Sequence, residues 1–130
     1  MLASFAGDYG MDRDTALKVA GAFGGGFGRL GHTCGAITGG MMAIGLRYGK
    51  TVPEDDPARE KTYALAGEFI EKFKERHRTT LCRELIECDI STPEGVQTAR
   101  DRQLFTALCP KYVRTAVEIL EELLQETRLD

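Results

Sequence analysis

Cysteine is the residue type in this chain that offers the most chemistry, and its placement is not random. Cys34, Cys82 and Cys109 each lie where a threonine or a proline marks the start of an expected helix. A helix N-terminus carries about half a positive charge and unpaired N–H groups, and both favour a thiolate over a thiol. Such thiols have pKa values lowered from about 8.5 into a range of roughly 3.5–7.5. We therefore predict three activated thiols that attack disulfides, become oxidised or bind soft metals.

The remaining cysteine and the spacing of all four leave their shared role open. No CxxC pair occurs, which removes the strongest signature of a zinc or thioredoxin-like site, and without CxxCH we expect no covalent c-type haem. Cys88 lies at the end of the helix that Cys82 begins, where the helix dipole disfavours a thiolate, so we interpret it as a bystander. Because free cysteine is among the most often buried residue types, a purely structural role is the alternative for all four.

A glycine-rich segment, GGGFGRLG at residues 24–31, leads into Cys34. Its glycines formally match GxGxxG, but that dinucleotide fingerprint needs a preceding strand, and the preceding segment has helical periodicity instead. The loop is interpreted as a tight connection that presents Cys34, or alternatively as an anion-binding or cofactor-binding loop to which Arg29 adds charge. The candidate cofactor-binding glycines are Gly26, Gly28, Gly31, Gly35 and Gly39.

The two histidines are weaker candidates. His32 lies two residues before Cys34 and is a possible proton carrier, although a loop histidine without a chemical role is the favoured interpretation. His77 is expected to be solvated at the end of a charged helix. No HExxH or ExxH motif indicates a zinc or di-iron hydrolase.

Helical periodicity recurs along the chain, and no run of β-branched residues alternates with polar ones. We expect a helix capped by Asp12, and helices over residues 34 to about 47, 81–88 and 93–105. The long helix is expected from Asp56, its cap, to about residue 78, and a last helix begins at residues 109–110. The long helix has an expected core stripe of Tyr63, Ala66, Phe69, Ile70 and Phe73. The last helix has an apolar seam, typical of a bundle or a dimer interface, made of Val113, Ala116, Val117, Leu120, Leu123 and Leu124. The prediction is an all-α fold, a small bundle of about five to seven helices.

The composition bounds the class of protein. The chain has 130 residues, of which 42% are hydrophobic and 28% charged, and one domain over residues 1–130 is expected. Its net charge is -3 and its charges are interspersed, so nucleic-acid binding is not expected. The longest apolar stretch, residues 33–46, is shorter than the roughly 18–20 residues of a membrane span. No signal peptide begins the chain, so we expect a cytoplasmic protein without membrane insertion or permanent disulfides.

The stretch GGGFGRLGHTCGAITGGMMAIGLRYG resembles the central signature of the C-GCAxxG-C-C family of redox-active proteins, with the core at residues 34–39. The stretches LCREL with Cys82 and CPKYV with Cys109 resemble the two later cysteines of that family. The resemblance implies a redox role for the cysteines. One departure is that the family has an earlier cysteine, whereas this sequence has none before Cys34, and its start resembles the segment just after that position. A four-cysteine site would then need Cys88 or a second subunit.

We therefore expect a thiol-redox protein or an iron–sulfur or other soft-metal protein, acting with an unidentified redox partner. Cys34 is the expected principal thiolate, with Cys82 and Cys109 as resolving thiols or co-ligands and Cys88 as a further candidate ligand. The sequence does not decide between these chemistries or whether the protein is an enzyme. The alternative is a non-catalytic helical homodimer that binds partners and has buried structural cysteines. A small-molecule pocket over the glycine loop is a third, weaker interpretation.

Overall fold

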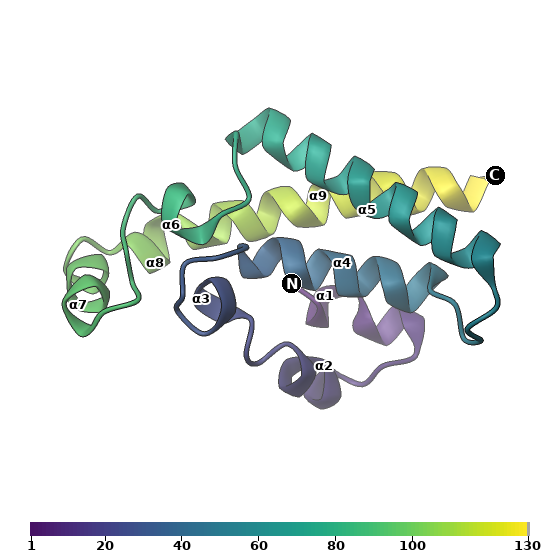
Figure 1. Ribbon diagram of the computed structural model, residues 1–130, viewed down its shortest axis with the longest axis horizontal. Coiled ribbons are helices and arrows are strands. Elements are labelled where there is room, and N and C mark those ends of the chain that lie inside the picture. The colour runs from purple at the N-terminus through teal and green to yellow at the C-terminus, as the bar shows by residue number, and fades with distance from the viewer. Residues whose placement is uncertain (130) are drawn as a thin grey trace.

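Three long helices form the body of the computed structural model, which describes residues 1–129 and the side chains as far as residue 125 (Figure 1). They are α4 (Gly35–Tyr48), α5 (Asp56–His77) and α9 (Cys109–Leu129), and each of them contacts the other two. The predicted all-α class is confirmed, because the described residues form helices, turns and one isolated β-bridge. No helix in the described part of the chain is long and apolar enough to cross a membrane.

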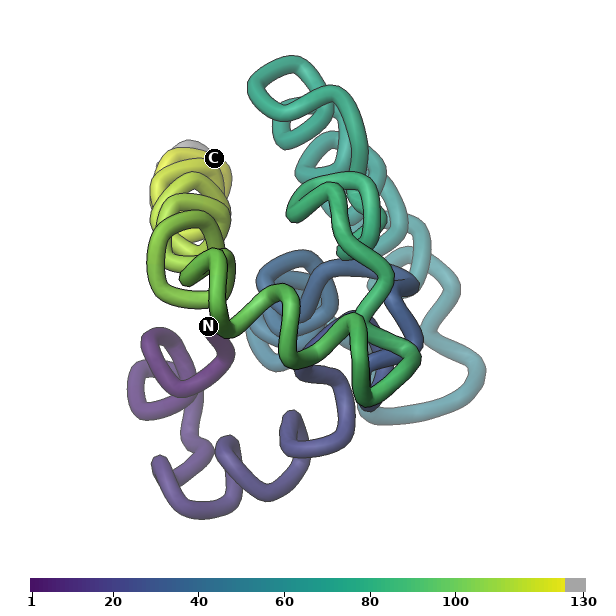
Figure 2. Tube along the Cα trace, turned by 90° about the vertical axis from the view of Figure 1, so that its left-hand side faces the viewer, coloured from purple at the N-terminus to yellow at the C-terminus, as the bar shows by residue number. Residues whose placement is uncertain are grey.

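The shorter helices lie beside this body and at one end of it. Residues 1–34 cover the side of α4 that faces away from α5 (Figures 1 and 2). They contain α1 (Ala3–Ala6), a 3-10 turn (Gly7–Tyr9), α2 (Arg13–Val19) and α3 (Gly24–Phe27). The connection from α5 to α9 contains α6 (Cys82–Leu85), α7 (Pro93–Asp101) and α8 (Leu104–Ala107). The cysteines therefore come from the end of the bundle at which α4 and α9 both begin.

Side-chain caps explain where several helices begin. A carboxylate oxygen of Asp12 accepts the N–H of Thr15 at 3.0 Å, and one of Asp55 accepts the N–H of Ala58 at 3.2 Å. Thr92 caps α7 in the same way. Each bond satisfies one of the N–H groups that have no partner within the first turn of a helix. The long helix thus begins at the expected place, with the cap one residue earlier than the sequence indicated.

Two expected helices are shorter than the sequence pattern indicated, and left-handed residues account for both differences. The helix expected over residues 81–88 ends at Leu85, and Glu87 (φ 52°) turns the chain before Cys88. The helix expected over residues 93–105 is divided at Gln103 (φ 57°) into α7 and α8. A residue with positive φ cannot continue a right-handed helix, which needs negative φ at every residue.

The packed centre of the molecule lies where α4, α5 and α9 meet. Phe69 is fully buried there, and a Cβ built on Gly40 would lie 2.5 Å from its Cζ and 3.3 Å from Cδ1 of Leu120. Of the expected α5 stripe, Phe69 and Phe73 are buried, whereas Tyr63 is 64% exposed, and that part of the prediction is wrong. The buried line runs at four-residue spacing through Leu65, Phe69 and Phe73, which leaves Tyr63 on the solvent side.

The apolar seam of α9 is used inside the chain. Ala116, Leu120, Leu123 and Leu124 are buried in the same core as residues of α4 and α5. The bundle alone thus accounts for the seam, and the homodimer expected from it stays a prediction.

Candidate functional site

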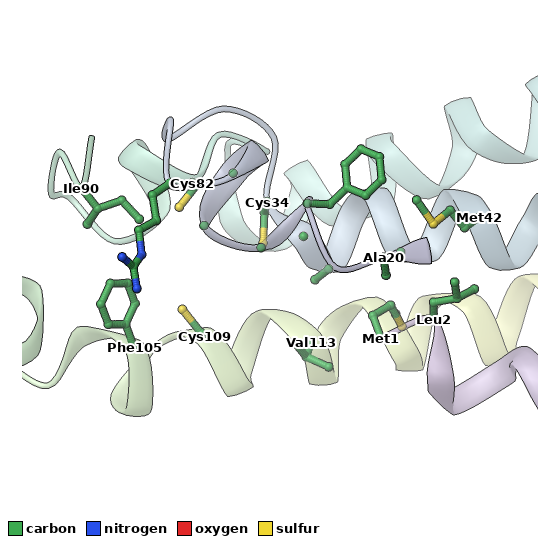
Figure 3. Close-up of a pocket in the computed structure, with 18 residues that line it drawn as sticks. Met1, Leu2, Ala20, Cys34, Met42, Cys82, Ile90, Phe105, Cys109 and Val113 are labelled. Atoms are coloured by element: carbon green, nitrogen blue, oxygen red, sulfur yellow. The ribbon is translucent and has the colours of Figure 1, made fainter. Parts of the chain in front are cut away.

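Three of the four cysteines line one cavity at the end of the bundle. Cys34, Cys82 and Cys109 lie on its wall, its volume is about 490 Å³, and all three are free thiols. The side chains of Cys34 and Cys82 point toward α9, and that of Cys109 points from α9 toward them (Figure 3). The fold thus brings together the three residues that the sequence selected.

Backbone pairing orients two of these thiols. The N–H of Cys34 donates to the carbonyl of Thr80 at 2.8 Å, and the N–H of Cys82 donates to the carbonyl of His32 at 2.6 Å. These bonds flank an isolated antiparallel bridge. Because side chains alternate between the two sides of such a pairing, Cys34 and Cys82 lie on the same side. Diagonal neighbours in this arrangement are about 7–8 Å apart, which is longer than the roughly 4.4–6.8 Å between the Cα atoms of a disulfide, so the backbone must move for these two residues to form one.

A buried tyrosine connects α6, which begins with Cys82, to α9, which begins with Cys109. Tyr112 lies one turn after Cys109 on α9, and its hydroxyl donates to the carbonyl of Leu85 at 2.6 Å. Leu85 is the last residue of α6, the short helix that begins with Cys82. This bond therefore fixes the position of α6, and with it Cys82, relative to Cys109.

The glycine loop packs directly against Cys82. Gly26 has φ 67°, and a Cβ at this position would lie 2.7 Å from Cβ of Cys82 and 2.6 Å from N of His32. Of the candidate glycines, Gly26, Gly35 and Gly39 line the cavity. Gly28 and Gly31 do not line it; they are left-handed turn residues with φ 62° and 76°.

The same loop uses its own N–H groups. Those of residues 27–32 all donate to carbonyls of residues 23–27. These six N–H groups are therefore not available to an anion, and the anion-binding interpretation of the rest of the loop stays a prediction. The interpretation as a tight connection that presents Cys34 accounts for these bonds.

Burial raises the pKa of all three cavity thiols. For Cys34, desolvation raises the pKa, although the N–H groups of Ala36 and Ile37 at the start of α4 act in the opposite direction. The pKa of Cys82 is raised to about 11, first by burial and then by negative charge on Cys34, Cys109 and Cys88. Burial, and then negative charge on Cys34, also raises the pKa of Cys109. The expected lowering by helix N-termini is therefore wrong, because desolvation of the thiolate outweighs the helix end.

Arg29 has the one charged side chain among the described residues that line the cavity. The rest of the wall is glycine or apolar and includes Met1, Leu2, Ala20, Phe23, Ala36, Met42, Ile90, Phe105 and Val113. Sequence reasoning named Arg29 only as part of the loop and did not find the apolar wall, because its members come from distant segments without a shared motif.

The remaining candidates lie outside the cavity. His32 contributes its backbone, and its ring packs on Phe27 with centroids 5.7 Å apart. His77 is not solvated as predicted, since its Nε2 lies 2.8 Å from Oγ1 of Thr115. Burial, and then the charge of Arg76, lowers the pKa of His77. The thiol of Cys88 donates to the carbonyl of Gly95 at 3.5 Å.

The described cavity wall does not have the side-chain arrangement of a metal site. Among the described residues, no three Cys, His, Asp or Glu side chains are placed to hold a metal ion. The cysteines as positioned do not fit a metal ion or cluster, and the ligand set of Cys34, Cys82, Cys109 and Cys88 stays a prediction.

Comparison with known proteins gives one result. The family model described as "Putative redox-active protein (C_GCAxxG_C_C)" matches residues 1–123, a range that contains all three cavity cysteines. No curated protein and no solved structure matches the chain.

Proposed function

We propose that this chain, which belongs to the C_GCAxxG_C_C family of redox-active proteins, exchanges dithiol and disulfide at Cys34, Cys82 and Cys109. The observation that carries the proposal is that three free thiols from separate segments face one mainly apolar cavity. Two thiols in a shared space can pass two electrons to a substrate disulfide, which a solitary buried cysteine cannot do.

Cys34 is the proposed attacking residue. It caps α4, and the N–H groups of Ala36 and Ile37 favour its thiolate against the effect of burial. Its thiolate attacks one sulfur of a substrate disulfide, the substrate S–S bond breaks, and the first substrate thiolate leaves. A second protein thiolate then attacks the sulfur of Cys34 and releases the second substrate thiolate. The two protein thiols are oxidised, the substrate disulfide is reduced, and the two protons pass to the released thiolates.

Cys82 is the proposed resolving residue, with Cys109 as the alternative. The backbone pairing places Cys82 on the same side as Cys34, and negative charge on Cys34 raises its pKa. A disulfide between them removes two thiols that disfavour each other's ionisation. Raised pKa values slow the attack at neutral pH, but they also favour the disulfide, because the reduced form gains little from ionisation.

The test is to oxidise the native reduced protein with a small disulfide, quench it in acid and map the remaining thiols by mass spectrometry. We expect an intrachain disulfide from Cys34 to Cys82 or Cys109, while Cys88 stays free. Cys34→Ser should abolish this disulfide, and the matched control Cys88→Ser should form it normally. Reaction of the cavity thiols only after unfolding would overturn the proposal.

A second candidate is binding of a soft metal or an iron–sulfur cluster. The favouring observation is that the thiolates of Cys34 and Cys109 raise the pKa of Cys82, and a bound cation would relieve this repulsion. The positions of the side chains do not support it. Metal analysis of protein purified without oxygen decides the question: metal that is present in Cys88→Ser but lost from Cys34→Ser would favour this candidate.

A further inference from the structure

We propose that the disulfide substrate carries a negative charge close to its S–S bond and that Arg29 binds this charge. The inference rests on the proposed function and names the class of substrate for the same cavity. The remainder of the substrate is apolar.

In the described part of the chain, Arg29 lacks a partner of opposite charge. It lines the cavity wall, and in the described part of the chain no carboxylate forms an ion pair with it. It is exposed, so a ligand that enters the cavity can reach its guanidinium. A guanidinium binds a carboxylate with two parallel, charge-assisted hydrogen bonds, which are stronger than neutral ones.

The glycine loop holds the backbone of Arg29 in place. Its backbone is left-handed (φ 71°), and its N–H donates to the carbonyl of Gly24 at 3.3 Å. A Cβ on Gly25 would lie 3.0 Å from Cγ of Arg29 and 3.5 Å from Cδ1 of Ile90. Glycine at this position therefore makes room for the arginine stem and places it beside Ile90.

The described cavity wall around Arg29 carries no negative charge at neutral pH. No carboxylate lines the described cavity wall, and burial raises the pKa of each of the three thiols, which keeps them uncharged at neutral pH. An anion that reaches Arg29 is therefore not repelled by other groups on the wall.

The order of residues along the cavity indicates where each part of the substrate lies. Figure 3 places the three cysteines between Ile90 and Phe105 at one end and Met1 and Met42 at the other. Arg29 lies beside Ile90, so the anionic group belongs at that end and the apolar substituent at the methionine end. The volume of about 490 Å³ suits a small molecule. The matching class is a disulfide of a small mercapto acid with an apolar group on its second sulfur.

The experiment compares an anionic mixed disulfide, that of mercaptoacetate and thiophenol, with a neutral one, that of mercaptoethanol and thiophenol. Rate constants for oxidation of the native protein are measured for both, and their ratio is corrected by the same ratio in unfolded protein. The variants are Arg29→Gln and the matched control Arg83→Gln. Arg83 follows Cys82 in sequence and packs on Gly31, but it does not line the cavity, so both variants lose one positive charge.

We expect the corrected anionic-to-neutral ratio to fall about tenfold in Arg29→Gln, since a charge-assisted hydrogen bond contributes about this factor. Arg83→Gln should keep the wild-type ratio, and Arg29→Lys should keep part of it, because an ammonium group retains the charge but not the two parallel hydrogen bonds. An unchanged ratio in Arg29→Gln, or an equal fall in Arg83→Gln, overturns the inference while leaving the proposed function intact. Failure of both disulfides to produce an intrachain disulfide in wild type overturns the proposed function itself.

Ionic strength provides a measurement that needs no variant. Salt screens the approach of an anion to an exposed arginine, so the preference of wild type for the anionic disulfide should fall as salt is added. A preference that does not depend on salt contradicts the role of Arg29.

Discussion

The beginning of α4 and its middle are both rich in glycine, but these glycines face different surroundings. Around Gly40, the ring of Phe69 and the side chain of Leu120 fill the space that a Cβ would occupy. Around Gly35, the facing elements leave a cavity whose wall includes Cys34 and Cys109. Glycine therefore allows close approach in both places, to the ring of Phe69 at Gly40 and to the backbone of Phe23 and Gly24 at Gly35, and only the second contact lies on the cavity wall.

This difference separates stability from chemistry. The packed centre depends on many apolar contacts among three long helices, whereas the cavity end depends on a few specific ones: the antiparallel bridge, the fit of Gly26 and the hydroxyl of Tyr112. Changes at the centre should alter the free energy of unfolding without changing the relative reactivities of the three thiols. Changes at the cavity end should alter the reactivity of one thiol relative to the others.

The largest expected effect comes from the packed centre. Phe69→Ala should lower the free energy of unfolding by about 3–5 kcal/mol, because it removes a fully buried ring and leaves a space that the helices cannot close. Denaturant titration measures this change. The matched variant Phe105→Ala, at the half-buried cavity wall, should cost clearly less. Equal costs would mean that the cavity end is packed as tightly as the centre.

The next effect comes from the cavity end. Gly26→Ala places a Cβ against the backbone of His32 and against Cys82 in a left-handed conformation, so it should cost about 3 kcal/mol. It should also raise the alkylation rate of Cys82 in the folded state, because the loop must move away. The control is Gly45→Ala, which meets nothing within 4 Å and should stabilise α4 by up to about 1 kcal/mol. A Gly26→Ala variant of wild-type stability would show that the loop does not need glycine.

Local signals in the sequence were enough for much of this arrangement. Asp12 and Thr92 indicate helix starts through hydrogen bonds made within the next three residues, so the sequence carries the whole interaction. The candidate cysteines lie together for a related reason: each follows a loop, and the loops meet where the long helices begin.

Properties that depend on tertiary burial could not be predicted in this way. The pKa of Cys34 depends on how completely neighbouring segments exclude water, and the helix start alone gave the wrong direction. His77 was expected to be solvated because its neighbours in sequence are charged, but Thr115 and Tyr112 of α9 cover it. The apolar cavity wall joins Met1 to Phe105, and nothing local to either residue marks it.

A smaller effect is expected from pH. The pKa of Cys82 is about 11 when folded, against 9.0 in its ordinary state, so between these values the folded protein keeps a proton that the unfolded chain releases. The free energy of unfolding should therefore be unaffected by this group below pH 9 and fall as the pH rises toward 11. Denaturant titrations across this range measure the fall, which should be reduced in Cys82→Ala. A variant with the same pH dependence as wild type would assign the fall to other groups.

The smallest expected effect on stability has the most specific consequence. Tyr112→Phe removes the hydrogen bond to Leu85 but keeps the ring that packs on Phe73, so it should cost about 1 kcal/mol. Because this bond fixes the helix that begins with Cys82, the alkylation rate of Cys82 should rise relative to that of Cys34. Tyr63→Phe is the matched control, since Tyr63 is exposed, and it should change neither quantity. If Tyr112→Phe slows or speeds both cysteines equally, the hydroxyl supports the cavity as a whole and does not position one thiol.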